Sequence, residues 1–190
     1  AQIIQLDNNR LISGDFEGID VIVAGVFAGG KRPLNRSMRH IRTWIESGGH
    51  FVSQYHRPID NWDKTQSAPL RLQPGSPSIR WRVTDAAAPV RMLQPDHPLL
   101  NSPNRITNED FDGWVKERGL YFASEWDPAY VPLLAMSDTD EAPLEGSLLA
   151  ARIGAGSHVH CALNLFYQMD HMVVGAFRLF ANLMMPSGRT

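Results

Sequence analysis

The sequence has a single cysteine, Cys161, in 190 residues. This excludes an internal disulfide and a cysteine-based structural zinc site. It has no apolar run near the roughly 20 residues that a membrane-spanning helix needs. It also has no excess of positive charge, since 18 Lys and Arg against 20 Asp and Glu give a formal net charge of −2. We therefore expect a cytoplasmic protein that binds neither nucleic acid nor membranes.

The first third predicts the order strand, helix, strand. Residues 19–25 (IDVIVAG) are a β-branched run typical of a strand covered on both faces, and residues 50–55 (HFVSQY) form the next strand. Apolar residues between them recur at helical spacing, and a glycine pair ends the helix. The apolar positions of this helix are Leu34, Met38, Ile41 and Ile45, and the basic positions that face water are Arg36, Arg39, His40 and Arg42.

Such a unit implies a parallel pair of strands, and ligands bind parallel sheets at the carboxyl ends of the strands. This places the expected crevice beside residues 25–30 and 55–60.

The middle of the chain is irregular, and the last third is regular again. Thr107 and Asp110 have the spacing of a capping box, which predicts a short helix over residues 108–115. Further strands are predicted at residues 3–6, 120–124, 131–136, 148–153 and 158–163, with a hairpin turn at 154–156, and one or two short strands within residues 79–93. The closing helix covers residues 172–185, with Val173, Phe177, Phe180 and Met184 on one face. The pattern predicts one α/β domain over residues 1–190: an open parallel sheet with an antiparallel C-terminal extension.

The turn after the 50–55 strand is where an α/β fold can present a nucleophile. It offers Tyr55, His56, Arg57 and Pro58, with no Ser or Cys and no flanking glycine pair. Cys161 lies inside a predicted strand, which is typical of a small buried side chain. The sequence therefore identifies no catalytic residue, and His56, Glu125 and Asp60 are its weak candidates.

His158 and His160 are two apart on a predicted strand, so they share a face in a geometry that a metal ion can use. No H-E-x-x-H or comparable carboxylate arrangement accompanies them. We favour a half-buried strand face over a metal site and expect no cofactor in this chain.

Aromatic and charged side chains gather at predicted strand ends and loops, as in sites for sugars or small polar ligands. The candidate ligand-binding residues are Tyr55, His56, Arg57, Trp62, Asp112, Trp114, Arg118, Glu125 and Trp126. The competing interpretation makes the tryptophans core residues with neutralising charges beside them.

Several segments resemble one domain of a known family. They are FVSQYHRPIDNW, VTDAAAPVRMLQPDHPLLNSPNRIT, DFDGWVKERGLYFASEWDP and VVGAFRLFANLM. These strings resemble the C-terminal domain of bacterial LmbE-like, PIG-L-type deacetylases. That domain is similar to class I glutamine amidotransferases and to ThuA-like domains, so the resemblance implies a flavodoxin-like sheet.

The sequence departs from that family in three ways. The His-Pro-Asp-Asp zinc motif of the deacetylase domain is absent, and residues 95–98 (PDHP) are not a version of it. The resemblance therefore implies zinc only for a deacetylase domain that this chain lacks. An amidotransferase has a Cys nucleophile where this chain has Tyr55 and His56, which implies a degenerate active site. Family members also have a strand and helix before residues 3–6, so we expect a fragment that lacks both.

Three functions remain open. The leading hypothesis is a non-catalytic accessory domain that supports binding of a glycan or small polar ligand, or subunit contacts, beside the deacetylase domain. The second is a hydrolase with His56 as base and Glu125 or Asp60 as its partner. The third is a homo-oligomerisation module with Trp62, Trp114 and the Met-rich last helix at its interface.

Overall fold

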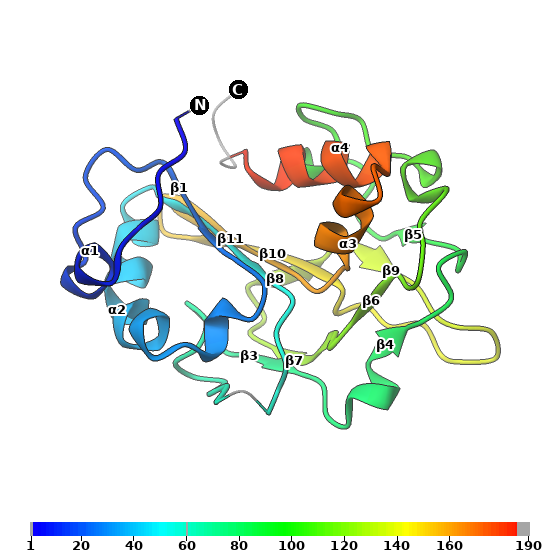
Figure 1. Cartoon of the computed structure of the whole chain (residues 1–190), viewed down its shortest axis with the longest axis horizontal. Coiled ribbons are helices and arrows are strands. Elements are labelled where there is room, and N and C mark those ends of the chain that lie inside the picture. The colour runs from blue at the N-terminus through cyan, green and yellow to red at the C-terminus, as the bar shows by residue number, and fades with distance from the viewer. Residues whose placement is uncertain (1, 60, 186–190) are drawn as a thin grey trace.

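The structure is a computed structural model that describes residues 2–59 and 61–185. A five-stranded sheet runs through its centre with helices on both faces (Figure 1). In spatial order its strands are β1 (Val21–Ala24), β2 (His50–Gln54), β11 (Gly156–Cys161), β10 (Leu148–Ile153) and β8 (Tyr130–Pro132). β1, β2 and β11 are parallel, whereas β10 is antiparallel to both of its neighbours. The predicted α/β class is confirmed, including the hairpin that joins β10 to β11.

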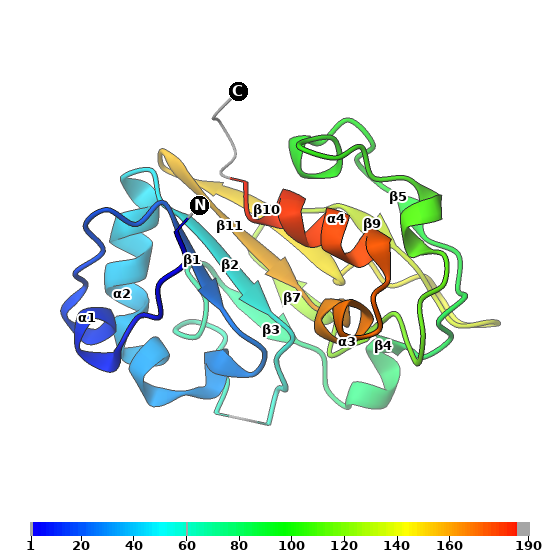
Figure 2. The same cartoon turned by 45° about the horizontal axis from the view of Figure 1, so that its top comes forward.

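Helices lie on both sides of the sheet (Figure 2). The helices on one side are α1 (Asn8–Ser13) and α2 (Arg32–Glu46), and those on the other are α3 (Leu165–Asp170) and α4 (Val174–Leu183). Helix α1 packs on the outside of α2. Each face has its own hydrophobic cluster, with α2 in one and α4 in the other. In the part of the chain that the structure describes, no helix is long and apolar enough to span a membrane.

Helix α2 forms as the sequence predicts. Its four apolar positions, Leu34, Met38, Ile41 and Ile45, are all buried against the sheet. The spacing of these residues keeps them on one stripe of the helix, while the basic residues between them face outwards.

Within the described residues, three small antiparallel sheets and four short 3₁₀ helices lie in the connections. The sheets pair β3 (Leu72–Pro74) with β7 (Ala123–Trp126), β4 (Arg82–Val83) with β6 (Gly119–Leu120), and β5 (Arg91–Met92) with β9 (Leu134–Ala135). The 3₁₀ helices are η1 (Ala28–Gly30), η2 (Ser78–Arg80), η3 (Pro98–Leu100) and η4 (Asn108–Phe111). The predicted capping box of Thr107 and Asp110 is confirmed at the start of η4.

The predicted strand at residues 3–6 is wrong, because this segment has no regular structure and Ile3 is 94% exposed. Helix α1 follows instead, and the Asp7 side chain caps it by accepting from two backbone N–H groups. Helix α3 was not predicted either. Both helices have six residues, which is too short for an apolar period to show in the sequence.

Of the four residues placed on one face of the last helix, Val173, Phe180 and Met184 pack against the core, whereas Phe177 is 43% exposed. The most deeply buried side chains of the helix are Ala176, Leu179 and Leu183. Small residues let α4 approach the chain closely: an added Cβ on Gly175 would lie 1.9 Å from the backbone oxygen of Asp110. The buried side of α4 is therefore set by close packing against η4.

This close approach gives a stability prediction. Gly175→Ala is expected to lower the free energy of unfolding by about 1–3 kcal/mol, because the methyl group would overlap backbone and force α4 away. Alanine favours helix over glycine, so propensity alone would give the opposite sign. Urea unfolding measures the change, with Val174→Ala at a 70% exposed position as the control. A Gly175→Ala variant as stable as the parent would contradict the packing.

Candidate functional site

The carboxyl ends of β1, β2 and β11 meet at one edge of the sheet, where the sequence places the crevice. Tyr55 follows β2 with a backbone φ of 24°, in a region that bulky side chains rarely adopt. Its N–H donates to the Cys161 carbonyl at 2.8 Å, and its own carbonyl accepts from the Phe27 N–H at 3.0 Å. The strained turn is thus fixed by the last residue of β11 and by the loop that follows β1.

Two more aromatic residues with left-handed backbone surround Tyr55. Phe27 has φ 59° and Tyr121 has φ 60°, and their rings lie 5.6 and 5.5 Å from the Tyr55 ring, edge to face. Phe166 completes the enclosure at 5.5 Å. Strain of this kind costs about 1–3 kcal/mol per residue and gathers at functional sites. In this structure the residues with strained backbone are Tyr55 and its aromatic neighbours.

The Tyr55 hydroxyl lies in a small buried cluster of polar side chains. It donates to Oε1 of Glu117 at 3.1 Å, and Nδ2 of Asn164 donates to the same oxygen at 2.8 Å. Burial, and then the charge of Glu117 and the hydrogen bond to it, raise the pKa of Tyr55. The phenol therefore stays protonated and engaged, which makes it a poor nucleophile.

His56 follows Tyr55 and is almost fully buried. Its ring packs on Trp62 with centroids 4.5 Å apart, and the Trp62 indole N–H donates to the Leu72 carbonyl at 2.8 Å. Gly29 leaves room for this pair, since an added Cβ there would lie 2.7 Å from the Trp62 ring. Arg57 turns the other way and stacks over Phe27 at 4.8 Å. Asp60 lies outside the described residues.

His158 and His160 share a face of β11 as predicted, but the interpretation of that face as half-buried is wrong because both side chains are fully buried. The Ser53 hydroxyl lies 2.9 Å from Nε2 of His158 and 2.9 Å from Nδ1 of His160. The Tyr130 hydroxyl lies 2.6 Å from Nδ1 of His158. Burial lowers the pKa of His158 well below its usual range and that of His160 to about 3. Both rings are therefore neutral near pH 7 and serve as hydrogen-bond partners inside the sheet.

Neither histidine belongs to a metal-binding group in the structure. Among residues 2–59 and 61–185, no three His, Cys, Asp or Glu side chains are arranged to hold a metal ion. Cys161 is buried as predicted, and burial raises its thiol pKa to about 12.

Trp114 and Arg118 lie together in the interior. The Arg118 guanidinium donates to the carbonyls of Ala88 and Phe111 and stacks 5.4 Å from the Trp114 ring. Burial lowers the pKa of Arg118 to about 10, so it keeps its charge at pH 7. These contacts hold three loop segments together, whereas Asp112 nearby is exposed.

Glu125 and Trp126 end β7. The Glu125 carboxylate is half exposed and lies 3.5 Å from Lys64 and 4.0 Å from Arg71. Trp126 is partly buried and pairs with Leu72, the residue whose carbonyl accepts from Trp62. The predicted ligand residues thus fall into separate groups. Tyr55, His56 and Trp62 share the strand ends, and their role in binding stays a prediction.

Sequence reasoning gave no role to Asn164 and Tyr121 at the Tyr55 turn. Both follow short strands or bridges, and no pattern in the sequence marks a positive φ at a tyrosine. Asn164 is 1% exposed, and its Oδ1 has no hydrogen-bond partner among the described residues. One feature of the sequence could have pointed to Asn164: it is the single polar amide in the otherwise apolar run of residues 161–166.

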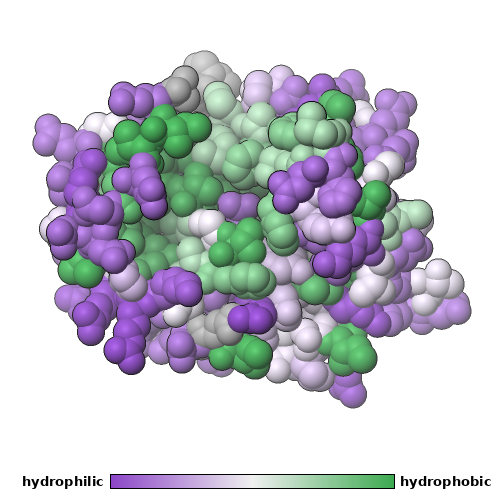
Figure 3. Space-filling view, in the orientation of Figure 1, coloured by the Kyte–Doolittle hydropathy of each residue, from purple (hydrophilic) through white to green (hydrophobic). Residues whose placement is uncertain are grey.

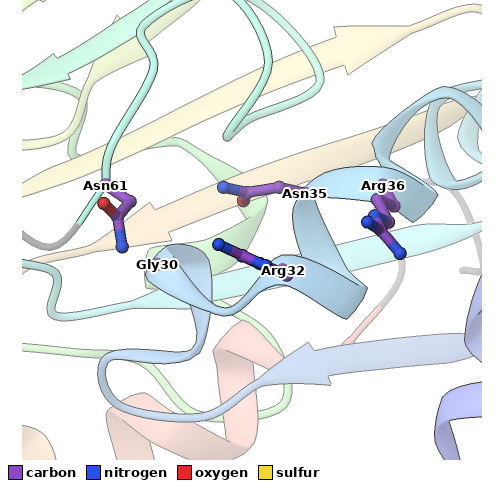
Figure 4. Close-up of a pocket in the computed structure, with 5 residues that line it drawn as sticks. All are labelled: Gly30, Arg32, Asn35, Arg36 and Asn61. Carbon is purple, nitrogen blue, oxygen red and sulfur yellow. The ribbon is translucent and has the colours of Figure 1, made fainter.

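Two surface cavities open along α2, next to this edge of the sheet. The first, of about 360 Å³, begins at η1 after β1 and is lined by Gly30, Arg32, Asn35, Arg36 and Asn61 (Figure 4). The second, of about 500 Å³, continues along the helix and is lined by Asn35, Arg36, Met38, Arg39, His40, Arg42, Thr65, Gln66 and Pro69. The first cavity borders the expected crevice, yet its polar side chains were not among the predicted ligand residues.

The site and the sheet define a mixed α/β protein, and solved structures share this fold. No protein-family profile and no curated protein matches the sequence. The cytoplasmic protein STM3548 from Salmonella typhimurium is similar over 96% of this chain and 75% of its own, with a TM-score of 0.60 and 11% identity. At this identity the likeness shows the fold alone.

Two glycosidases are similar more distantly. The exo-β-1,4-mannosidase Op5Man5 from an Opitutaceae bacterium has a TM-score of 0.48 and 16% identity over 90% of this chain and 26% of its own. A cold-adapted β-galactosidase from Rahnella sp. R3 has a TM-score of 0.47 and 14% identity over 90% of this chain and 23% of its own. This chain thus spans about a quarter of either glycosidase.

Proposed function

We propose that this chain is a flavodoxin-like, class I glutamine-amidotransferase-like domain without catalytic activity of its own. It serves as an accessory domain of a PIG-L/LmbE-like deacetylase, where it supports binding of a small polar ligand or subunit contacts. The observation that carries the proposal is the Tyr55 turn. It has the strained backbone of a nucleophile-bearing turn, but it holds a protonated phenol enclosed by aromatic rings.

The surroundings of the turn support a structural use of its strain. Glu117 is 6% exposed and accepts from both Tyr55 and Asn164, so its carboxylate is engaged inside the chain. The Gln168 amide in turn bonds both backbone groups of Val115 and the Glu117 carbonyl. A carboxylate committed to internal bonds in this way holds loops in place.

Exposed apolar side chains favour the subunit-contact role. Met172, Val174 and Phe177 are 74%, 70% and 43% exposed near the start of α4. Figure 3 shows apolar residues around a hollow that lies over the β1 edge of the sheet and extends towards α4. Apolar surface gathered in one area marks interfaces more often than scattered residues do. Trp114 takes no part, because it is buried inside the chain.

The absence of catalysis is tested with the 190-residue chain. We expect no turnover of glutamine, 4-nitrophenyl acetate or N-acetylglucosamine above the buffer rate, and the same result for His56→Asn. We also expect the chain to co-purify with a separately expressed LmbE-like deacetylase domain. Turnover that His56→Asn abolishes would establish the hydrolase alternative and overturn the proposal. Failure to co-purify would remove the deacetylase as partner.

A further inference from the structure

Positive charge is concentrated on α2 although the chain as a whole is slightly acidic. Of 18 Lys and Arg residues, five lie between positions 31 and 46, where Glu46 is the single acidic residue. The basic residues of this segment are Lys31, Arg32, Arg36, Arg39 and Arg42, with His40 among them. Helix α2 therefore carries a local positive potential that the net charge of −2 conceals.

Most of these cations have no acidic partner among the described residues. Arg42 pairs with Glu46 at 3.1 Å, but Arg32, Arg36 and Arg39 make no ion pair with any residue in 2–59 or 61–185. The first turn of α2 has no acidic residue, and no side chain caps its N-terminus. Cations at a helix N-terminus oppose the helix dipole, and like charges three or four residues apart repel. The arrangement is unfavourable for the isolated helix and favourable for a bound anion.

The charged side chains line concave surface. Arg32 and Arg36 line the first cavity, and Arg36 continues into the second together with Arg39 and Arg42. In Figure 4 the side chains of Arg32 and Asn35 point towards Asn61 on the opposite loop, while Arg36 stands one turn further along the helix. Volumes of about 360 and 500 Å³ are those of small-molecule sites. A flat surface for a nucleic-acid duplex would have neither recess.

The polar lining adds groups that suit hydroxyls. Asn35 and Asn61 lie on opposite sides of the first cavity, and Oδ1 of Asn35 is buried without a hydrogen-bond partner among the described residues. Thr65 and Gln66 line the second cavity from the facing loop. Amides both donate and accept, whereas guanidinium groups bind carboxylate or phosphate oxygens in pairs. The lining therefore combines an anion site with sites for neutral polar groups.

We infer that the α2 groove, formed by these two cavities, binds a small polyhydroxylated molecule that carries a phosphate or carboxylate group, that is, an acidic sugar. Arg32 and Arg36 bind the anionic group, and Asn35 and Asn61 bind neighbouring hydroxyls. This inference rests on the binding role proposed above and names its ligand class. Phosphate and carboxylate share the chemistry that Arg recognises, and the experiment separates them.

Calorimetric titration with glucose 6-phosphate, glucuronate and glucose tests the inference. We expect at least one of the two acids to bind and glucose to bind at least tenfold more weakly. The stronger acid identifies the anionic group. The double variant Arg32→Gln/Arg36→Gln is expected to weaken that binding at least tenfold, and added salt to weaken it further. The matched control is Arg80→Gln, because Arg80 is exposed in η2, beside β4 on the other side of the molecule in Figure 1.

Three results would overturn the inference: no binding of either acid, equal binding by the double variant with an unchanged circular dichroism spectrum, or glucose binding as tightly as the acids. Turnover of a bound acid would instead overturn the non-catalytic proposal and leave the site intact. If neither acid binds and nothing is turned over, the proposal of an accessory domain that acts through subunit contacts still stands. The two failures are therefore distinguishable.

Discussion

Between pH 6.5 and pH 5 the free energy of unfolding is expected to fall by about 1.4 kcal/mol per pH unit for each fully buried histidine. Burial lowers the pKa of His50, His158 and His160 in the folded chain, and the shifts of His158 and His160 are large enough to keep both rings neutral there. In the unfolded chain they bind protons below about pH 6.5. The unfolded state therefore binds more protons as the pH falls, and stability is lost. For His160 the loss continues to about pH 3.

The proton count is measured by urea unfolding at several pH values. His160→Leu is expected to lower the pH slope by about one proton, because it removes one buried imidazole. His40→Gln is the matched control, since His40 is exposed on α2. The carboxyls of Asp63 and Asp138 have lowered pKa values, so their contribution is lost below this window. Half-buried His97 also has a pKa lowered by burial and adds a smaller share. Stability that is flat from pH 7 to 5 would contradict neutral burial of His158 and His160.

Arg118→Met is expected to lower the free energy of unfolding by about 3 kcal/mol. The change keeps the apolar stem but leaves the buried carbonyls of Ala88 and Phe111 without their donor, and each such loss costs about 1–3 kcal/mol. Stacking on Trp114 is lost as well. Thermal or urea unfolding measures the difference.

Two further variants separate a structural role from a ligand-binding one. Arg118→Lys keeps the positive charge but lacks the planar guanidinium group that donates to two carbonyls at once, so an intermediate loss of stability is expected. Arg91→Met serves as control, because the Arg91 side chain is 68% exposed. If Arg118→Met is as stable as the parent, Arg118 does not stabilise the fold. That result would favour the predicted role of Arg118 in ligand binding.

The central sheet and α2 could be predicted because their residues have a strong period. Residues 21–24 are all apolar, residues 50–54 have Phe51 and Val52 beside three polar residues, and the α2 stripe repeats over three turns. Their burial follows from local pattern alone. The six-residue helices and two-residue strands could not be found this way, since they exist only where distant segments supply their partners.

The candidate site could likewise be predicted only in part. The sequence placed a crevice at the strand ends, and the structure has the Tyr55 turn and the first cavity there. It did not reveal that Tyr55 and Tyr121 share left-handed backbone, because no residue type signals that conformation at a tyrosine. It also treated Arg36 and Arg39 as a water-facing row. Only the facing loop at Asn61 and Thr65 turns that row into one side of a groove.

The hydrogen bonds of the buried histidines also bear on how the chain folds as it is made. His50 and Ser53 emerge early, yet their partners Ser157, His158 and His160 follow more than 100 residues later, and the Leu183 carbonyl follows 133 residues after His50. Until β11 is synthesised, the β1–α2–β2 segment has polar groups with nothing to satisfy them in a dry interior. Such long-range pairing slows folding, so the nascent first half is expected to depend on chaperones until β11 and α4 are complete.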